Sequence, residues 1–183
     1  MADIALMGGM GAGKTTVADY LVEHYGYTAK KISTPIYGIA EQLWGPEAAK
    51  DRGKLQELGI KMREIDEDVW LNLYLEDVTK AREEGLDIVN DTLRMRNEYW
   101  ALKELGFKFI RILTREATRQ DRLMKIGRIQ DSSELQHATE TDLIGLEAAK
   151  EGIGADYTIT NDGDLELLYA QIQGVMLNIE GES

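Results

Sequence analysis

The chain has 183 residues and a formal net charge of −12 at pH 7, with 43% apolar and 30% charged residues. This composition is typical of a soluble globular protein, and the length suits one compact domain with an insert. The sequence contains no cysteine, which excludes a disulfide framework, a thiolate zinc site and a cysteine nucleophile. No apolar run approaches the roughly 20 residues of a membrane helix, and no secretion signal is recognisable, so we expect a cytoplasmic protein.

Short apolar segments alternate with helical patterns along the chain. We expect strands at residues 3–7, 28–32, 86–90, 107–113 and 156–160. We expect helices at residues 14–25, 35–44, 54–84, 94–105, 115–126, 137–150 and 164–179. No change in composition divides the chain, so we expect a single domain over residues 1–183. Strands separated by helices predict the α/β class, with a parallel sheet of about five strands flanked by helices.

Basic residues concentrate in one part of this acidic chain. Residues 108–128 carry seven basic and two acidic side chains, a local charge of +5, while the remainder carries −17. The overall charge argues against binding to duplex nucleic acid, and the local excess predicts a small anionic ligand.

The segment Gly8-Gly9-Met10-Gly11-Ala12-Gly13-Lys14-Thr15 matches the pattern G-x-x-x-x-G-K-[ST] between a predicted strand and a predicted helix. Glycines let successive N–H groups turn toward a phosphate, and the following helix adds its positive end. Lys14 is expected to contact the β- and γ-phosphates, and the Thr15 hydroxyl to bind Mg²⁺. The alternative is a glycine-rich turn without a ligand. We predict ATP and Mg²⁺ at this loop, with contacts from Gly9, Met10, Gly11, Ala12, Gly13, Lys14, Thr15 and Thr16.

Two observations narrow the class of P-loop protein. No asparagine is followed by lysine, so the N-K-x-D motif of GTPases is absent, and the chain is too short for a large motor ATPase. Arg115, Arg119 and Arg122 recur at a spacing that places them on one helix face, as a flap over phosphates would require. A solvated basic helix is the alternative for this segment. The pattern favours a small kinase.

Further short motifs follow the glycine loop, and their order along the chain matches that of a known family. They are Ile32-Ser33-Thr34-Pro35, Arg63-Glu64-Ile65-Asp66, Asp91-Thr92-Leu93-Arg94, His137-Ala138-Thr139-Glu140 and Asn161-Asp162-Gly163. The chain resembles the deoxynucleoside monophosphate kinases of bacteriophages and, more distantly, dephospho-coenzyme A kinase. The resemblance implies a three-layer P-loop nucleotide kinase fold, an acceptor-binding helical region over residues 34–85 and a helical lid over residues 115–136.

The resemblance also implies roles at the phosphates. Asp91 follows a buried strand at the edge that carries the glycine loop and is expected to hold Mg²⁺, with a helix cap as the alternative. The family usually has Asp-x-Arg here, whereas two residues separate Asp91 from Arg94. Arg94 is the expected clamp on the acceptor phosphate, with a surface salt bridge as its alternative. Arg122 and Arg128 are the flap arginines that we expect to stabilise the transferring group.

Other roles concern the acceptor and the base. The resemblance assigns Arg63 to the acceptor, and Asn161 and Gly163 to the adenine of the donor. We also expect Thr34, Trp70 and Glu140 on the acceptor side, where Glu140 would orient an arginine; a simple helix start is its alternative. Packing in the core is the alternative for Trp70, and Thr34 stands where relatives often have aspartate.

The implied reaction is transfer of the γ-phosphoryl group of ATP to the 5′-phosphate of a deoxynucleoside monophosphate. The alternatives are a kinase acting on a hydroxyl, such as dephospho-coenzyme A kinase or a kinase of modified nucleotides in DNA, a non-catalytic ATP-binding regulator and a GTP switch. A hydroxyl acceptor would need a general base, which Asp91 could supply. The chain could act as a monomer or as a homodimer.

Overall fold

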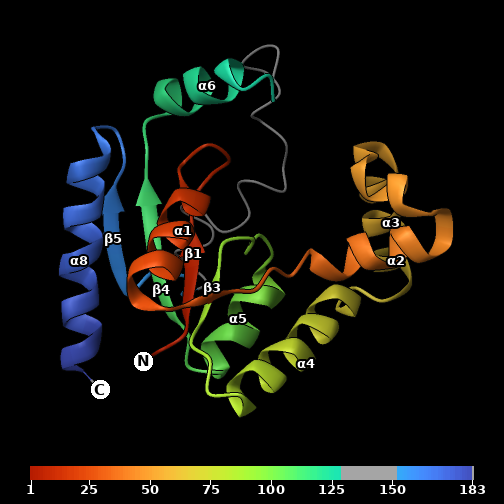
Figure 1. Cartoon of the computed structure of the whole chain (residues 1–183), viewed down its shortest axis with the longest axis horizontal. Coiled ribbons are helices and arrows are strands. Elements are labelled where there is room, and N and C mark those ends of the chain that lie inside the picture. Colours follow the sequence, from red (N-terminus) through yellow and green to blue (C-terminus); the bar gives the residue numbers. More distant parts are fainter. Residues whose placement is uncertain (129–151, 183) are drawn as a thin grey trace. The chain divides into compact units, whose positions relative to one another are not determined.

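The computed structural model describes residues 1–128 and 152–182, and contacts divide the chain into two compact units. The core unit comprises Met1–Ala29 and Asp87–Ser183. The helical unit comprises Lys30–Leu86. Each unit has its own set of elements, and Figure 1 labels β1, β3, β4 and β5 in the sheet of the core unit.

The core unit contains a five-stranded parallel sheet in the order β2-β3-β1-β4-β5. The strands are β1 (Ile4–Met7), β2 (Thr28–Ala29), β3 (Ile88–Asn90), β4 (Lys108–Leu113) and β5 (Tyr157–Thr160). The α/β class and the parallel sheet are therefore confirmed. All five strands are shorter than the sequence predicts. β1, β4 and β5 each begin one residue later, β2 ends at Ala29, just before the helical unit begins, and β3 begins at Ile88 rather than at residue 86.

Helices cover both faces of the sheet. Helices α1 (Lys14–Tyr25) and α8 (Leu165–Gly181) pack on one face, in a continuous core with Leu6, Ile110 and Ile159. On the other face α5 (Arg96–Glu104) places the ring of Tyr99 with its centroid 4.4 Å from that of Phe109 on β4. The remaining described helix of this unit is α6 (Glu116–Lys125), which follows β4 (Figure 1). This arrangement confirms the three-layer fold, while the predicted helix at residues 137–150 lies outside the described residues.

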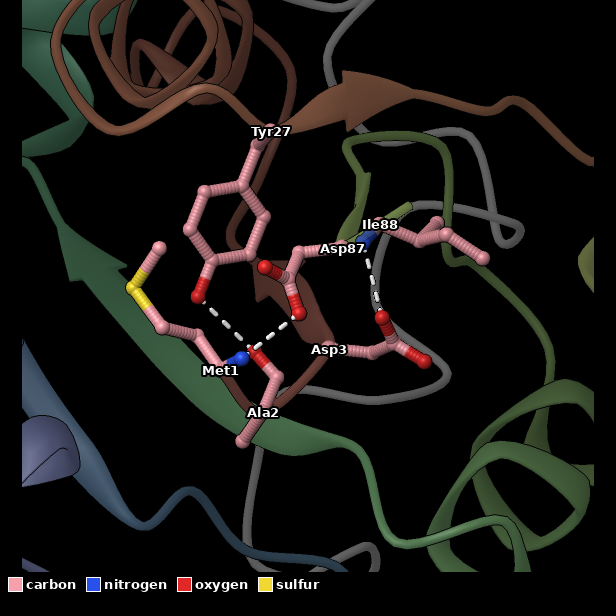
Figure 2. A network of polar contacts seen from close by, with 6 residues as sticks. All are labelled: Met1, Ala2, Asp3, Tyr27, Asp87 and Ile88. Carbon is pink, nitrogen blue, oxygen red and sulfur yellow. Dashed lines mark hydrogen bonds and ion pairs between the residues drawn. The ribbon is translucent and has the colours of Figure 1, made fainter. Parts of the chain in front are cut away.

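A polar network fixes the amino ends of β1 and β3 (Figure 2). The Asp3 carboxylate accepts a hydrogen bond from the Ile88 N–H at 2.7 Å, and the Met1 α-ammonium contacts the Asp87 carboxylate at 2.8 Å. The Tyr27 hydroxyl donates to the carbonyl of Ala2 at 2.8 Å, and its burial raises the pKa of that phenol. These contacts lie at the sheet edge opposite to the carboxyl ends of the strands.

The helical unit consists of α2 (Thr34–Trp44), a 3-10 helix (Pro46–Lys50), α3 (Arg52–Ile65) and α4 (Val69–Glu83), with α2 in contact with both α3 and α4. The helical stretch predicted for residues 54–84 is divided in two. Asp66 adopts an extended backbone, and its carboxylate accepts a hydrogen bond from the Asp68 N–H at 3.0 Å, which replaces the helical pattern with a turn. None of the helices that the structure describes is long and apolar enough to cross a membrane.

Candidate functional site

Four strands of the core unit end in residues that gather at one edge of the sheet. Gly8 follows β1, Asp91 follows β3, Thr114 follows β4 and Asn161 follows β5. In open parallel sheets, ligands bind outside the carboxyl ends of the strands, where the strand order reverses. Here β1 lies between β3 and β4, so the glycine loop occupies that reversal point.

The conformation of the glycine loop requires glycine at two positions. Gly11 and Gly13 have φ values of 79° and 102°, in the region that side chains disfavour. A Cβ on Gly11 would lie 3.0 Å from the Leu123 Cγ on α6, and a Cβ on Gly13 would collide with the Asn161 amide nitrogen. The pattern of glycines therefore reflects both backbone geometry and the close approach of α6 and Asn161.

Side chains donate hydrogen bonds to several carbonyl groups of the loop. The Lys14 Nζ donates to the carbonyls of Gly8 at 2.6 Å and Gly9 at 3.2 Å. The Arg119 guanidinium donates to the Met10 carbonyl at 3.2 Å. The Ala12 carbonyl accepts hydrogen bonds from the Thr114 hydroxyl at 3.1 Å and from the Asn161 amide at 2.8 Å. The carbonyls of Gly8, Gly9, Met10 and Ala12 are thus engaged, and the Ala12 N–H donates to the Gly9 carbonyl at 3.1 Å, so the other N–H groups of the loop are the candidates to bind an anion.

The start of α1 completes a cradle that fits a phosphate. Its N-cap is Gly13, which provides no side-chain cap. The first N–H groups of a helix have no partner within the helix, and together with the helix dipole they favour an anion. A loop of positive-φ glycines that leads directly into a helix N-terminus without a side-chain cap therefore fits the phosphates of a nucleotide, as the sequence predicts.

Thr15 and Asp91 meet at the cradle. The Thr15 hydroxyl donates to the Asp91 Oδ2 at 2.8 Å, and Asp91 is only 6% exposed. The turn after β3 is shaped by Asn90, whose side-chain oxygen accepts a hydrogen bond from the Thr92 N–H at 2.8 Å. The residue inserted before Arg94 thus leaves Asp91 beside the predicted metal-binding hydroxyl.

This pair of oxygen ligands fits Mg²⁺, which binds proteins through one or two oxygen groups and keeps waters and substrate phosphates as its other ligands. Among the described side chains, no three histidine, cysteine or carboxylate groups gather to form a metal cage by themselves. Thr15 and Asp91 are therefore the residues that would hold the ion, and their metal role stays a prediction.

Helix α6 contacts the glycine loop through Arg119 and Leu123, which the sequence analysis did not select as site residues. Arg119 contacts the Met10 carbonyl, and a Cβ on Gly9 would collide with its guanidinium. Leu123 is buried, with Met10 packed against it. The spacing of Arg119 to Arg115 and Arg122 pointed to one helix face, but only the fold identifies Arg119 as the arginine over the loop.

The two chosen flap arginines differ in position. The Arg122 guanidinium donates to the Asn161 side-chain oxygen at 3.3 Å, next to the cradle. Arg128 is exposed beyond the end of α6, where its N–H donates to the Leu123 carbonyl at 2.9 Å. Residues 129–136 of the predicted lid, and Glu140, lie outside the described residues.

The loop after β5 is fixed to the start of α6. The Asp162 carboxylate accepts a hydrogen bond from the Arg115 N–H at 2.9 Å, and this bond lowers the pKa of the carboxyl below its ordinary value. Gly163 is exposed, whereas the Asn161 side chain is engaged with the Ala12 carbonyl and Arg122. The predicted adenine contact thus fits the exposed Gly163 backbone better than the Asn161 amide.

Arg94 lies on the loop between β3 and α5. Its N–H and that of Met95 donate to the buried Glu98 carboxylate at 2.8 and 3.0 Å. The Glu98 carboxylate therefore fixes the backbone from which the exposed Arg94 side chain extends. The role of Arg94 at an acceptor phosphate stays a prediction.

The remaining predicted acceptor residues belong to the helical unit. Arg63 lies in the last turn of α3, and its Nη1 is 3.9 Å from where a Cβ on Gly59 would be. Trp70 is 1% exposed, and its indole N–H donates to the Gly59 carbonyl at 3.1 Å. The position of Trp70 agrees with the packing alternative, so we no longer assign it to substrate. Thr34, at the first position of α2, and Arg63 stay predictions.

A family model described as an AAA domain matches residues 4–139. The chain belongs to the AAA domain family. A protein of Acanthamoeba polyphaga mimivirus, named "Putative deoxynucleotide monophosphate kinase", is 26% identical to this chain over 94% of both chains. The family, this relative and the shared fold of solved kinases confirm the prediction of a phosphotransferase.

Two solved structures illustrate the shared fold. Shikimate kinase from Acinetobacter baumannii superposes with a TM-score of 0.61 at 19% identity, covering 100% of this chain and 95% of the kinase. Dephospho-CoA kinase from Campylobacter jejuni superposes with a TM-score of 0.59 at 14% identity, covering 99% and 98% of the two chains. Both confirm the P-loop kinase fold.

The cradle geometry predicts a specific effect of Gly13→Ala. The substitution combines a disfavoured φ with a collision against Asn161, so we expect a loss of stability of about 1–3 kcal/mol and at least a roughly 10-fold weaker affinity for ATP. Gly174→Ala is the matched control, because Gly174 lies in α8 with open space around its Cβ position. The control should gain up to about 1 kcal/mol and bind ATP normally. Urea unfolding and calorimetric titration measure both effects, and equal behaviour of the two variants would contradict the cradle.

Proposed function

We propose that this chain transfers the γ-phosphoryl group of ATP to the 5′-phosphate of a deoxynucleoside monophosphate, yielding ADP and a deoxynucleoside diphosphate. The observation that carries the proposal is the similarity to the mimivirus protein over 94% of both chains, which is not confined to the glycine loop. The arrangement of Lys14, Thr15 and Asp91 at the carboxyl edge of the sheet supplies the donor side of such a reaction.

Phosphoryl transfer to a phosphate acceptor does not need a strong general base. A phosphate monoester has a second pKa of about 6, so the attacking oxygen is largely ionised at neutral pH. That oxygen forms a bond to the γ-phosphorus while the bond to the β–γ bridging oxygen breaks, and ADP departs. The protein's main tasks are to align the two phosphates and to offset their negative charge.

Each of these tasks falls to named side chains. Lys14 would turn from the loop carbonyls to the β- and γ-phosphates, and the cradle N–H groups would hold the same phosphates in place. Arg119 and Arg122 approach the cradle from α6 and would offset the charge of the moving phosphoryl group. Mg²⁺, bound at Thr15 and Asp91, would neutralise charge on the donor phosphates.

The acceptor side rests on Arg94 and Arg63. Both are guanidinium groups that can form paired hydrogen bonds with phosphate oxygens, and both occur in motifs that the resemblance assigns to the acceptor. We propose that Arg94 binds the acceptor phosphate, and the resemblance assigns Arg63, within the helical unit, to acceptor binding.

A hydroxyl-directed kinase is the alternative, as the names of the structural neighbours illustrate for their own substrates. Such a reaction would need Asp91 or another carboxylate as a base within hydrogen-bond reach of the acceptor. In this chain Asp91 is nearly buried and accepts a hydrogen bond from Thr15. That contact favours a role for Asp91 on the metal side over the role of a base.

An ADP-release assay with ATP and Mg²⁺ tests the proposed function. We expect turnover with one or more deoxynucleoside monophosphates and none with dephospho-coenzyme A or shikimate, because the predicted site has cationic groups for a phosphate acceptor. The Lys14→Ala variant is the control for contaminating kinases and should show no turnover. Turnover with a hydroxyl acceptor alone would overturn the proposal.

The metal-side contact predicts a difference between two substitutions of Thr15. Thr15→Ser keeps the hydroxyl that donates to Asp91, whereas Thr15→Val keeps the shape and removes it. We expect Thr15→Val to reduce kcat/KM on the order of 100-fold and to raise the Mg²⁺ concentration needed for half-maximal rate. Thr15→Ser should remain within a few-fold of the unmodified chain. Matching Mg²⁺ titrations for the two variants would contradict the assignment.

A further inference from the structure

The side chain of Asn161 connects two parts of the site that are distant in sequence. Asn161 is 5% exposed, its amide nitrogen donates to the Ala12 carbonyl at 2.8 Å, and its side-chain oxygen accepts from Arg122 at 3.3 Å. One planar amide therefore has its donor end on the glycine loop and its acceptor end on α6. These two contacts fix the orientation of the amide between the loop and the helix.

The backbone fixes where this amide lies. The Asn161 N–H donates to the Leu113 carbonyl at 2.8 Å, which continues the pairing of β4 and β5 by one residue. The side chain thus projects from the end of the sheet, where main-chain pairing holds its backbone. Gly13 leaves room for it, because any Cβ there would collide with the amide nitrogen.

Only a neutral amide satisfies both contacts. An aspartate would keep an acceptor for Arg122 but place a carboxylate oxygen against the Ala12 carbonyl, and a serine would be too short to reach both partners. The Ala12 carbonyl has a second donor in the Thr114 hydroxyl at 3.1 Å, which makes no contact of this kind with Arg122. The contribution specific to Asn161 is therefore the link between the loop and the arginine.

We propose that Asn161 is a positioning residue that couples the phosphate cradle to Arg122, so that bound phosphates and the arginine keep a fixed relative geometry. The proposal deepens the proposed function and rests on it only for the role of Arg122 in turnover. The coupling itself concerns the nucleotide donor and is independent of the acceptor's identity. It also moves Asn161 away from recognition of adenine.

A double-substitution cycle between Asn161→Ala and Arg122→Ala tests the coupling. The primary readout is the dissociation constant for ATP, measured by calorimetry, and the second is kcat with whichever acceptor the chain turns over. We expect each single substitution to weaken ATP binding, and Asn161→Ala to do so about 10-fold. The double variant should bind ATP with nearly the same affinity as the single variant that binds ATP more weakly, because both substitutions break the same link.

The matched control is the cycle between Thr114→Val and Arg122→Ala. Thr114 supports the same Ala12 carbonyl without touching Arg122, so the effects of these two substitutions should multiply. The ratio of kcat/KM for ATP to that for GTP should be unchanged in Asn161→Ala. If Asn161 had only a structural role, its substitution would lower stability, but the Asn161–Arg122 cycle would be as additive as the Thr114–Arg122 cycle.

Several results would overturn the inference. Multiplicative effects in the Asn161–Arg122 cycle would show that the two side chains act independently. A changed preference between ATP and GTP in Asn161→Ala would return Asn161 to base recognition. Unaltered ATP affinity in Arg122→Ala would leave nothing for Asn161 to position.

If Asn161→Ala does not fold by circular dichroism, Asn161→Asp carries the same test, since it keeps the acceptor for Arg122 and loses the donor to Ala12. It should weaken ATP binding, and Arg122→Ala should add little to that effect, because the link between the arginine and the glycine loop is already broken. The proposed function can fail without the coupling. In that case the chain would turn over another acceptor, while the Asn161–Arg122 cycle for ATP binding would still be non-additive.

Discussion

The site depends on one constraint, which is that a short loop must present N–H groups to an anion while its carbonyls point elsewhere. Carbonyl oxygens facing a phosphate would repel it, so each one needs a donor on the outer side. In this chain Arg119 provides such a donor for the Met10 carbonyl, and Thr114 and Asn161 provide donors for the Ala12 carbonyl. Phosphate binding by the loop is therefore a property of the surrounding sheet and helices as much as of the glycines.

The parallel sheet explains how these donors come together. Because every strand runs in the same direction, the residues that follow β1, β3, β4 and β5 meet at one edge. The opposite edge is fixed by the network of Asp3, Met1 and Tyr27 (Figure 2), which contributes to stability and not to the site. Rigid strand ends can hold polar side chains in the fixed geometry that phosphoryl transfer requires.

Local signals allowed part of this structure to be predicted from the sequence. The glycine loop and the helix at Lys14–Tyr25 follow from glycine positions and apolar periodicity, and the structure has the same helix bounds. The break at Asp66 depends on a side-chain turn that the helical pattern concealed. The contacts of Arg119 and Asn161 join residues more than 100 positions apart, so no local pattern could have selected them over Arg122, Arg128 or an adenine contact. The indole contact of Trp70 spans only 11 positions, but it joins α4 to α3 across the break at Asp66, so the sequence offered packing of Trp70 only as an alternative.

The central claim is that main-chain N–H groups of the glycine loop bind the phosphates of ATP. An NMR titration of the ¹⁵N-labelled chain with ATP and Mg²⁺ tests it most directly, because each amide reports its own environment. The account predicts that the largest saturable shifts fall on Gly11, Gly13, Lys14 and Thr15, and that adenosine without phosphates leaves these amides unmoved. Saturable binding of ATP with the loop amides unshifted, and the largest changes elsewhere in the chain, would contradict it.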